Sequence, residues 1–380
     1  MGRETMNPSE RLWAAIRVEK PDRVPVMPVM NPEPAAYLTG LTMAQVASST
    51  QVAMDAILKV FDEYGGWDVL APMVYKPVQM QAANFYPMKM RIPGRDLPED
   101  HMFQLVEEEI MKPEDYNKIC EMGMDRFYYE DYLWRISDLK PEDLPKEIED
   151  LTASVARLVM EAGKRGLQSL VGSFDMHPFF RLSLMRSMVP FTQDLYFNPE
   201  PVERTLKHMT AELISTHLKR VKESGASSWA IVEERASAFF YPLSVFERFW
   251  WPYTLEIIDA FWSEGVVTMF HLDQCWDKNI PYFKKLPKGS AVLQLDSLTD
   301  IFHAKEIVRG HLCLYGDVSA TLMSIGKPED VEAYCKKLID EVGGDGGFIL
   351  SNGCSMPPNP KPENVRAMID TGKNYEFSKK

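Results

Sequence analysis

The chain has 380 residues, 45% of them hydrophobic, which is enough for one large core or two ordinary ones, and we expect one compact domain with an insertion. Its formal net charge is −13 and its basic runs are no longer than two residues, which argues against nucleic acid as a partner. No apolar run approaches the roughly 20 residues that span a bilayer. In the first thirty residues, where an export signal would be apolar, charges recur every few positions. We therefore expect a cytoplasmic protein that does not enter membranes. Five widely spaced cysteines argue against a disulfide framework and leave the thiols as metal ligands or small core residues.

Short β-branched or apolar runs alternate with longer stretches of helical periodicity along the chain. This alternation is typical of repeated βα units around a parallel sheet. Eight runs are predicted as strands, at residues 24–29, 67–71, 169–173, 228–232, 266–270, 291–295, 311–316 and 347–351. Because eight strands close such a sheet, the sequence predicts an α/β fold, a (β/α)₈ TIM-type barrel, with residues 1–380 forming a single domain.

The longest gap between predicted strands follows the second strand. It holds four prolines between positions 77 and 98 and the alternating stretch at residues 86–92. One connecting helix needs only about 15 residues, so we expect an inserted segment at about residues 73–165 that carries a hairpin and extra helices. We expect this insertion to lie over one mouth of the barrel.

Polar residues follow the predicted strands, at the ends where parallel barrels carry their catalytic groups. They are Asn31 and Glu33 after the first strand, Asp175 and His177 after the third, Glu233 and Glu234 after the fourth, His271, Asp273 and Cys275 after the fifth, Asp296 after the sixth, Asp317 after the seventh and Cys354 after the eighth.

Glutamate, histidine and cysteine are side chains that bind Zn²⁺, and a catalytic zinc site uses about three of them. Candidates follow the fourth, fifth and eighth strands, whose ends meet at one mouth. The alternative is that the histidine after the fifth strand is a hydrogen-bonded core residue. Cys275 is either a ligand or a space-filling neighbour of Trp276.

Several segments resemble the uroporphyrinogen decarboxylase superfamily. Residues 7–26 (NPSERLWAAIRVEKPDRVPV) are similar to its N-terminal helix and entry to strand one, and residues 243–253 (LSVFERFWWPY) to one of its helices. His271 matches a strand-end histidine, residues 315–319 (YGDVS) match a turn, and residues 348–357 (FILSNGCSMP) with 362–365 (PENV) match the closing segment. The resemblance covers nearly the whole chain.

The resemblance implies methyl transfer more than decarboxylation. The decarboxylases carry an arginine-rich stretch near strand one that holds substrate carboxylates, whereas residues 30–37 here read MNPEPAAY. The methyltransferase branch binds zinc through a His-x-Cys pair after strand five and a cysteine after strand eight. His271 and Cys354 fall on two of these positions, and Asp273 stands at the third. The third ligand is therefore open between Asp273, Cys275 and Glu234.

We expect a zinc-dependent methyltransferase that moves a methyl group between a small O- or N-methylated substrate, for example a methyl aryl ether, and the cobalt of a separate corrinoid protein. Glu234, Asp273 and Asp317 are the expected catalytic residues. The corrinoid is expected on another protein because the nearest match to a cobalt-binding Asp-x-His-x-x-Gly loop, at residues 175–180, lacks the glycine. The alternatives are a coenzyme M-type thiol methyltransferase, a decarboxylase without metal, and a non-catalytic partner of a corrinoid protein.

Overall fold

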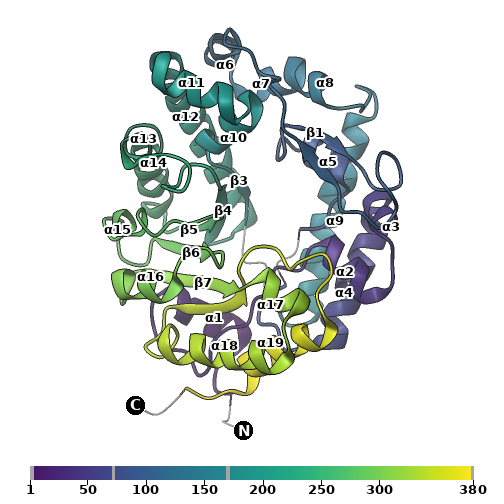
Figure 1. Ribbon diagram of the computed structural model, residues 1–380, viewed down its shortest axis with the longest axis vertical. Coiled ribbons are helices and arrows are strands. Elements are labelled where there is room, and N and C mark those ends of the chain that lie inside the picture. The colour runs from purple at the N-terminus through teal and green to yellow at the C-terminus, as the bar shows by residue number, and fades with distance from the viewer. Residues whose placement is uncertain (1–3, 71–72, 168–171, 378–380) are drawn as a thin grey trace.

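The computed structural model describes residues 4–70, 73–167 and 172–377. Its centre is a parallel sheet whose strands follow one another in chain order from β3 to β8 (Figure 1). The strands of this sheet are β3 (Phe174–Met176), β4 (Ser228–Glu233), β5 (Val267–Leu272), β6 (Ala291–Leu295), β7 (Cys313–Val318) and β8 (Phe348–Asn352).

The fourth to eighth predicted strands are confirmed as β4 to β8, with ends that differ by at most two residues. The third prediction, at residues 169–173, falls mostly on 168–171, which lie outside the described residues, and β3 begins just after it. The first predicted strand is no regular strand but an extended segment with one parallel bridge, from Val26 to Leu350. Pro25 and Pro28 explain this, because proline has no N–H to donate to a ladder.

The second predicted strand, described as far as Leu70, is likewise extended without forming a regular strand. The Asp68 N–H donates to the Val26 carbonyl at 2.8 Å, and the Met27 N–H donates to the Leu350 carbonyl at 3.0 Å. The two N-terminal segments therefore continue the ring beyond β8. This is the α/β architecture of a TIM-type barrel in which six positions are regular strands.

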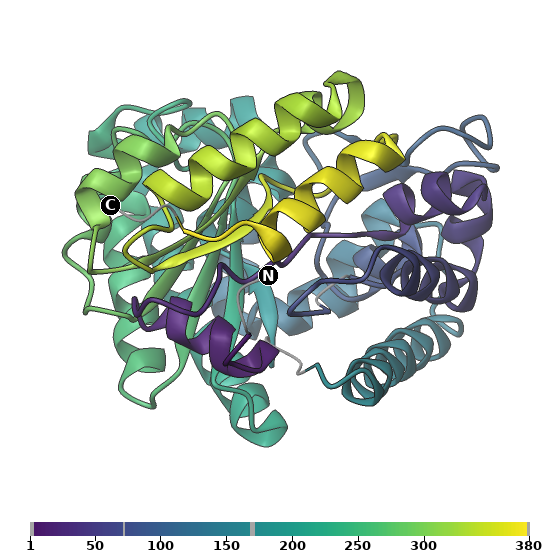
Figure 2. The same cartoon turned by 90° about the horizontal axis from the view of Figure 1, so that it is seen from below.

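Helices surround the sheet and lie between its strands in the chain. Figure 2 shows α18 and α19 running side by side over one side of the barrel. In chain order the helices are α1 (Pro8–Ile16), α2 (Pro32–Thr39), α3 (Met43–Ser48), α4 (Thr50–Tyr64), α5 (Pro77–Ala82), α6 (Asp115–Met122), α7 (Met124–Phe127), the π-helical turn η1 (Tyr128–Tyr132), α8 (Leu133–Ile136), α9 (Leu144–Lys164), α10 (Pro178–Arg186), α11 (Met188–Phe197), α12 (Pro199–Ser224), α13 (Leu243–Phe249), α14 (Trp251–Trp262), α15 (Ile280–Phe283), α16 (Ile301–Val308), α17 (Ala320–Ile325), α18 (Pro328–Glu341) and α19 (Pro362–Asn374). Within the described part of the chain, none of them has the length and apolar character needed to cross a membrane.

The segment between Met73 and Leu167 carries the expected hairpin and extra helices. Strands β1 (Lys89–Arg91) and β2 (Gln104–Val106) pair antiparallel, with α5 before them and α6 to α9 after them in the chain. An apolar cluster formed by side chains such as Tyr75, Phe85 and Met88 packs against Met176 at the end of β3 and against α10. This packing makes the residues before the hairpin a wall beside the strand ends.

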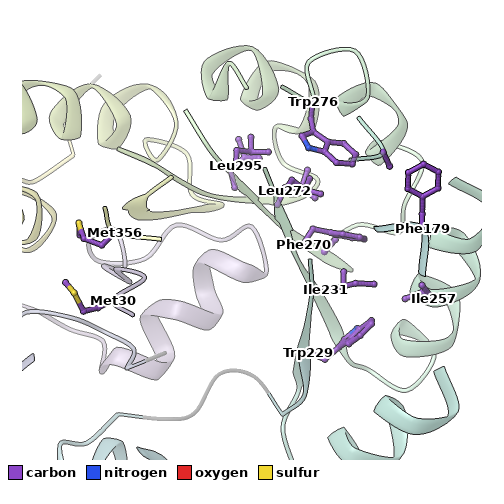
Figure 3. Close-up of a cluster of buried hydrophobic side chains, with 14 of the residues drawn as sticks. Met30, Phe179, Trp229, Ile231, Ile257, Phe270, Leu272, Trp276, Leu295 and Met356 are labelled. Carbon is purple, nitrogen blue, oxygen red and sulfur yellow. The ribbon is translucent and has the colours of Figure 1, made fainter. Parts of the chain in front are cut away.

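Alternation along the strands separates two layers of side chains. Trp229 and Ile231 of β4 and Phe270 of β5 belong to the large core between sheet and helices (Figure 3). Their neighbours Val267 and Met269 belong to a second cluster inside the barrel. Successive side chains of a strand point to opposite faces. Knowing which residues of a strand face inward therefore tells which residues at its end point into the mouth of the barrel.

A buried ionic network joins α1 to the first two extended segments. The Asp68 carboxylate accepts hydrogen bonds from Arg11 at 2.6 Å, from Arg23 at 2.7 and 3.0 Å, and from the Val26 N–H at 2.8 Å. Asp22 binds the same Arg11 guanidinium at 2.7 and 3.0 Å. Arg11 and Asp68 are almost fully buried, so each charge depends on the others for its stabilisation.

Candidate functional site

Strand alternation brings three polar side chains to the mouth of the barrel. His271 continues the inward phase of Val267 and Met269 in β5, and Glu234 continues that of the inward side chains of β4. Gln294 pairs in register with His271 on the neighbouring strand β6. The C-terminal ends of parallel strands meet at one face, so these residues lie together.

His271, Asp273 and Cys354 form a compact cluster at this mouth. The His271 Nε2 atom lies 3.4 Å from the Cys354 Sγ atom and 3.2 Å from the Asp273 Oδ2 atom. One donor atom from each of the three residues lies within 4.8 Å of the other two. Asp273 lies in the loop after β5 and Cys354 in the loop after β8. The two residues are about eighty positions apart in the sequence, but the closed ring of strands brings their side chains together.

Gln294 holds the His271 ring in place. Its Oε1 atom lies 2.7 Å from the His271 Nδ1 atom, and its Nε2 atom donates to the Gly353 carbonyl at 3.4 Å. Since the amide donates to Gly353, its oxygen faces the ring and accepts from Nδ1–H. The Nε2 atom is then directed to Asp273 and Cys354, which is the usual arrangement of a metal-binding histidine.

The charges of the cluster stabilise one another. Burial disfavours a charged imidazole, but the Asp273 carboxylate and the Cys354 sulfur outweigh it and raise the pKa of His271 well above its ordinary value. Burial likewise disfavours the Asp273 carboxylate, yet His271 keeps the pKa of Asp273 below its usual range. Burial raises the pKa of the Cys354 thiol. Three groups that compete for protons in this way are suited to share a cation.

Glu234 lies beside the cluster without joining it. Burial, and then the charge of Asp273, raises the pKa of Glu234 to about 7. The preceding Glu233 points outward, where its carboxylate accepts from the Trp250 indole at 2.7 Å. Alternation alone thus assigns the second of the two glutamates to the mouth.

Cys275 and Asp317 are not brought into the cluster. The Cys275 thiol donates to Asp277 at 3.3 Å. Asp317 accepts from the Tyr334 hydroxyl of α18 at 2.8 Å, and burial raises the pKa of Asp317 to about 7. Among the described residues, the three-ligand group therefore contains Asp273 and neither of these two side chains.

A second polar group lies at the same mouth, formed by Glu33, Tyr75 and Tyr86. The Tyr75 hydroxyl lies 3.2 Å from both carboxylate oxygens of Glu33, and burial raises the pKa of Glu33 to about 7. Burial raises the pKa of Tyr86 well above its ordinary value, and the charges of Glu234, Cys354, Asp273 and Glu33 add to this effect. Tyr86 therefore lies within electrostatic range of the cluster and of Glu33.

The titration of Glu33 predicts a pH-dependent stability. The folded chain keeps the Glu33 proton up to about pH 7, whereas an unperturbed glutamate releases it near 4.5. The folded state thus binds one more proton between these values, and its stability falls as the pH rises through them. Glu33→Gln removes this loss, so the unfolding free energy of the variant relative to the wild type should rise by up to about 1.4 kcal/mol per pH unit in that window. Urea titrations at a series of pH values measure it, and a difference independent of pH contradicts the assignment.

Sequence reasoning missed Gln294, Tyr75 and Tyr86. Gln294 lies within a strand and not after it. It could have been found because it is two residues before Asp296, so both side chains face the inside of the barrel along β6. The two tyrosines lie in the segment that leads to the hairpin. Only the packing of that segment against β3 and α10 brings them to the strand ends.

Comparisons with known proteins place these features in a family. The family model described as uroporphyrinogen decarboxylase (URO-D) matches residues 128–375. The methylcobamide:CoM methyltransferase MtbA of Methanosarcina mazei is 26% identical over 181 residues, which cover 48% of this chain and 52% of that protein. A uroporphyrinogen decarboxylase of Geotalea daltonii is 30% identical over 128 residues, covering 33% of this chain and 36% of that protein.

The solved structure of a methyltransferase from Methanosarcina mazei has the same fold, with a TM-score of 0.70 at 16% identity, over 97% of this chain and 99% of that one. The chain spans about half the length of the MtbA proteins it matches, including that of Methanosarcina acetivorans at 25% identity. Since the family model covers well over half of the residues and its closing segment contains Cys354, the chain belongs to the uroporphyrinogen decarboxylase (URO-D) family.

Proposed function

We propose that this protein is a corrinoid-dependent methyltransferase that moves a methyl group between a small O- or N-methylated substrate and the cobalt of a corrinoid carried by a separate protein. The observation that carries the proposal is the cluster of His271, Asp273 and Cys354 at the barrel mouth. The names of the MtbA relatives and the fold of the Methanosarcina methyltransferase support it. In the transfer the bond from heteroatom to methyl carbon breaks, a bond from cobalt to that carbon forms, and the heteroatom keeps the electron pair and takes a proton.

The donor atoms of the cluster fit zinc. Nitrogen, oxygen and sulfur ligands of a tetrahedral zinc ion lie about 3.4 to 3.6 Å from one another. The His271 nitrogen already lies 3.4 Å from the Cys354 sulfur and 3.2 Å from the Asp273 oxygen. Three protein ligands are also the usual number for a catalytic site with one open position. Zinc held by these residues supplies a Lewis acid for the heteroatom that carries the methyl group.

The other residues of the mouth have roles that their surroundings support. Gln294 orients His271, and Asp273 gives the ligand set a harder donor than a second thiolate, which suits an oxygen leaving group. Glu234, with a pKa of about 7 beside the cluster, is the group that can give a proton to the departing heteroatom or take one from an incoming hydroxyl near neutral pH. Asp317 accepts a hydrogen bond from the Tyr334 hydroxyl, and its role in this proposal is to hold the end of β7 in place.

A corrinoid on a separate protein agrees with the surroundings of residues 175–177. The Asp175 carboxylate accepts from His217 at 2.8 Å and pairs with Arg181. His177 is fully buried and lies 3.2 Å from the Thr254 hydroxyl. Both side chains of the Asp-x-His pair are therefore occupied inside the protein, and neither is free for a cobalt ion.

A second candidate is methylation of a coenzyme M-type thiol, and the names of the MtbA relatives favour it. Decarboxylation of a porphyrinogen is less compatible with the mouth. Glu33, Glu234 and Asp273 are all carboxyl groups at or near the cluster, and a substrate with many carboxylates needs cationic partners instead.

The test is to incubate the zinc-loaded protein with a corrinoid protein in its cob(I)alamin state and a panel of methyl ethers and methylamines, and to follow methylcobalamin formation by its absorbance. We expect transfer from at least one compound, lost in His271→Ala and retained in Cys275→Ala. A reverse assay starts from methylcobalamin and 2-mercaptoethanesulfonate. Transfer only in the reverse assay establishes the thiol reaction instead, and transfer in neither assay overturns the proposal.

Removal of the Gln294 side chain should weaken the metal site without abolishing it. Gln294→Ala frees the His271 ring, so we expect the dissociation constant for zinc to rise about 10- to 100-fold. Gln294→Glu keeps an oxygen acceptor for Nδ1–H and should restore most of the affinity. Competition with a chromogenic chelator measures both variants. Equal affinities of the alanine variant and the wild type contradict the positioning role.

A further inference from the structure

The inserted segment contains a cavity of about 280 Å³, bounded by α5, β1 and the loop that joins α8 to α9 (Figure 1). The residues that line it do not include His271, Asp273 or Cys354. At about 30 Å³ for each molecule of liquid water, this volume equals that of about nine waters. It lies at the lower end of the range for sites that hold small organic molecules.

The sequence of the loop between α8 and α9 explains why one side of the cavity is not filled by a helix. A residue that precedes proline disfavours the helical conformation, and Lys140 precedes Pro141. The helical run that ends at Ile136 therefore does not continue through this loop. Within the loop the Ser137 hydroxyl oxygen accepts from the Leu139 N–H at 3.1 Å, which gives the chain a defined course beside α5 and β1.

The most deeply buried residues that line the cavity carry no charge. They are Gln81 of α5, Met90 of β1 and Ile136 at the end of α8. The half-buried side chains of Val78 and Ile92 add further apolar surface. An ionised group of a ligand would lose its hydration at this end without meeting a counter-charge. The part of a ligand that is buried here must therefore be neutral and mainly apolar.

Gln81 places one acceptor without a partner in the lining. Its side chain is 4% exposed, and its Nε2 atom donates to the Met88 carbonyl at 2.7 Å and to the Ile136 carbonyl at 3.1 Å. Since both neighbours are carbonyl groups, the nitrogen faces them and the oxygen is directed away. Among the described residues no group donates to Oε1, and this atom is not one of the acceptors that the protein encloses completely. A buried acceptor in this position favours a ligand that brings a donor.

The charged residues of the lining are exposed and carry both signs. Arg95 and Lys140 are cationic, and Asp138 and Asp143 are anionic. The Arg95 Nη2 atom lies 3.2 Å from the Asp138 Oδ2 atom, and an exposed pair of this kind contributes little to stability in water. Because the charges at the opening are equal in number, they select neither anions nor cations.

We propose that this cavity is a binding site for a neutral, mainly apolar molecule of about the size of indole that carries one hydrogen-bond donor. The donor bonds to the Gln81 Oε1 atom, and the ring packs against the side chains of Met90 and Ile136. The Met90 sulfur adds a favourable contact with an aromatic ring. Since the site shares no residue with the metal cluster, its test does not depend on the proposed function.

The first measurement compares indole with 1-benzofuran, which has the same shape but an oxygen atom in place of the N–H group. Calorimetric titration of the full chain with each compound gives the two dissociation constants. We expect indole to bind about 5- to 10-fold more tightly, because one net hydrogen bond changes an affinity by about that factor. Equal affinities of the two compounds, or no saturable binding of indole, overturn the inference.

Variants of the lining separate the hydrogen bond from the apolar contacts. Gln81→Met removes the acceptor while keeping the length of the side chain, so indole and 1-benzofuran should bind it alike. Val78→Phe fills the cavity from α5, and Leu139→Phe fills it from the loop; each should abolish the binding of both compounds. Val155→Phe is the matched control, because it makes the same exchange on the exposed face of α9, outside the lining. Full binding in both filled variants, or an equal loss in Val155→Phe, overturns the assignment of the site.

The methyl signal of Met90 locates the ligand directly. In protein labelled at its methionine methyl groups, the ring of indole should shift the nuclear magnetic resonance signal of Met90, which is assigned by its absence in Met90→Leu. The signal of Met323, a buried methionine of α17 outside the lining, should not move. Saturable binding of indole that leaves the Met90 signal unchanged shows that the ligand lies elsewhere and overturns the inference.

Discussion

Cys354→Ala should lower the affinity for zinc by at least about 100-fold while the barrel stays folded. Loss of an orienting partner of a ligand already costs 10- to 100-fold, and removal of a ligand itself removes the bond. Cys354 lies in the loop after β8, at the functional face of the barrel, where substitutions have little effect on stability. Metal content after dialysis against a chelator and the circular dichroism of the apoprotein measure the two effects.

Two further variants separate the candidates for the third ligand. Asp273→Ala should lose zinc to a similar extent, because its carboxylate lies 3.2 Å from the His271 Nε2 atom. Cys275→Ala should retain zinc, since its thiol is bound to Asp277. It is the matched control for Cys354→Ala because both changes remove a half-buried thiol from the mouth side. Zinc loss in Cys275→Ala with retention in Asp273→Ala would reverse the assignment.

Asp68→Ala should destabilise the fold by about 3–5 kcal/mol, which is the usual cost of removing one partner from a buried ion pair. The change removes the fully buried carboxylate partner of Arg11 and Arg23, leaving Arg11 with Asp22 and Arg23 with Glu4, and removes an acceptor from the Val26 N–H. Because this network joins α1 to the first two segments of the ring, its loss affects the closure of the barrel. The midpoint of urea unfolding measures the change.

The control for Asp68 is Asp62, whose carboxylate pairs with Arg165 at 2.7 Å on the surface. Asp62→Ala should cost less than about 1 kcal/mol, because an exposed pair gains little in water. A cost for Asp68→Ala as small as that for Asp62→Ala would mean that the buried arginines find other partners, and the structural role given to the network would be wrong.

Much of the fold could be predicted from the sequence. The strands β4 to β8 are short runs of apolar residues, buried on both faces, and such runs are visible without a structure. The first N-terminal segment could not be assigned correctly as a regular strand, because its apolar composition is that of a strand while Pro25 and Pro28 remove the donors that a ladder requires. The hairpin was visible in the alternating residues 86–92, and the insertion that carries it was expected over one mouth of the barrel. The sequence did not show which of its side chains reach the strand ends.

The sequence by itself determined which residue types stand at the strand ends, and hence that His271 and Cys354 are candidate ligands at one mouth. Only the tertiary structure places the Asp273 carboxylate in the cluster with their side chains and leaves the Cys275 thiol hydrogen-bonded to Asp277. The reason is that a residue's direction is set by alternation inside a strand, whereas in the loop beyond it the direction depends on contacts with other loops. The same holds for Tyr75 and Tyr86, which reach the site only because an apolar cluster fixes their segment against β3 and α10.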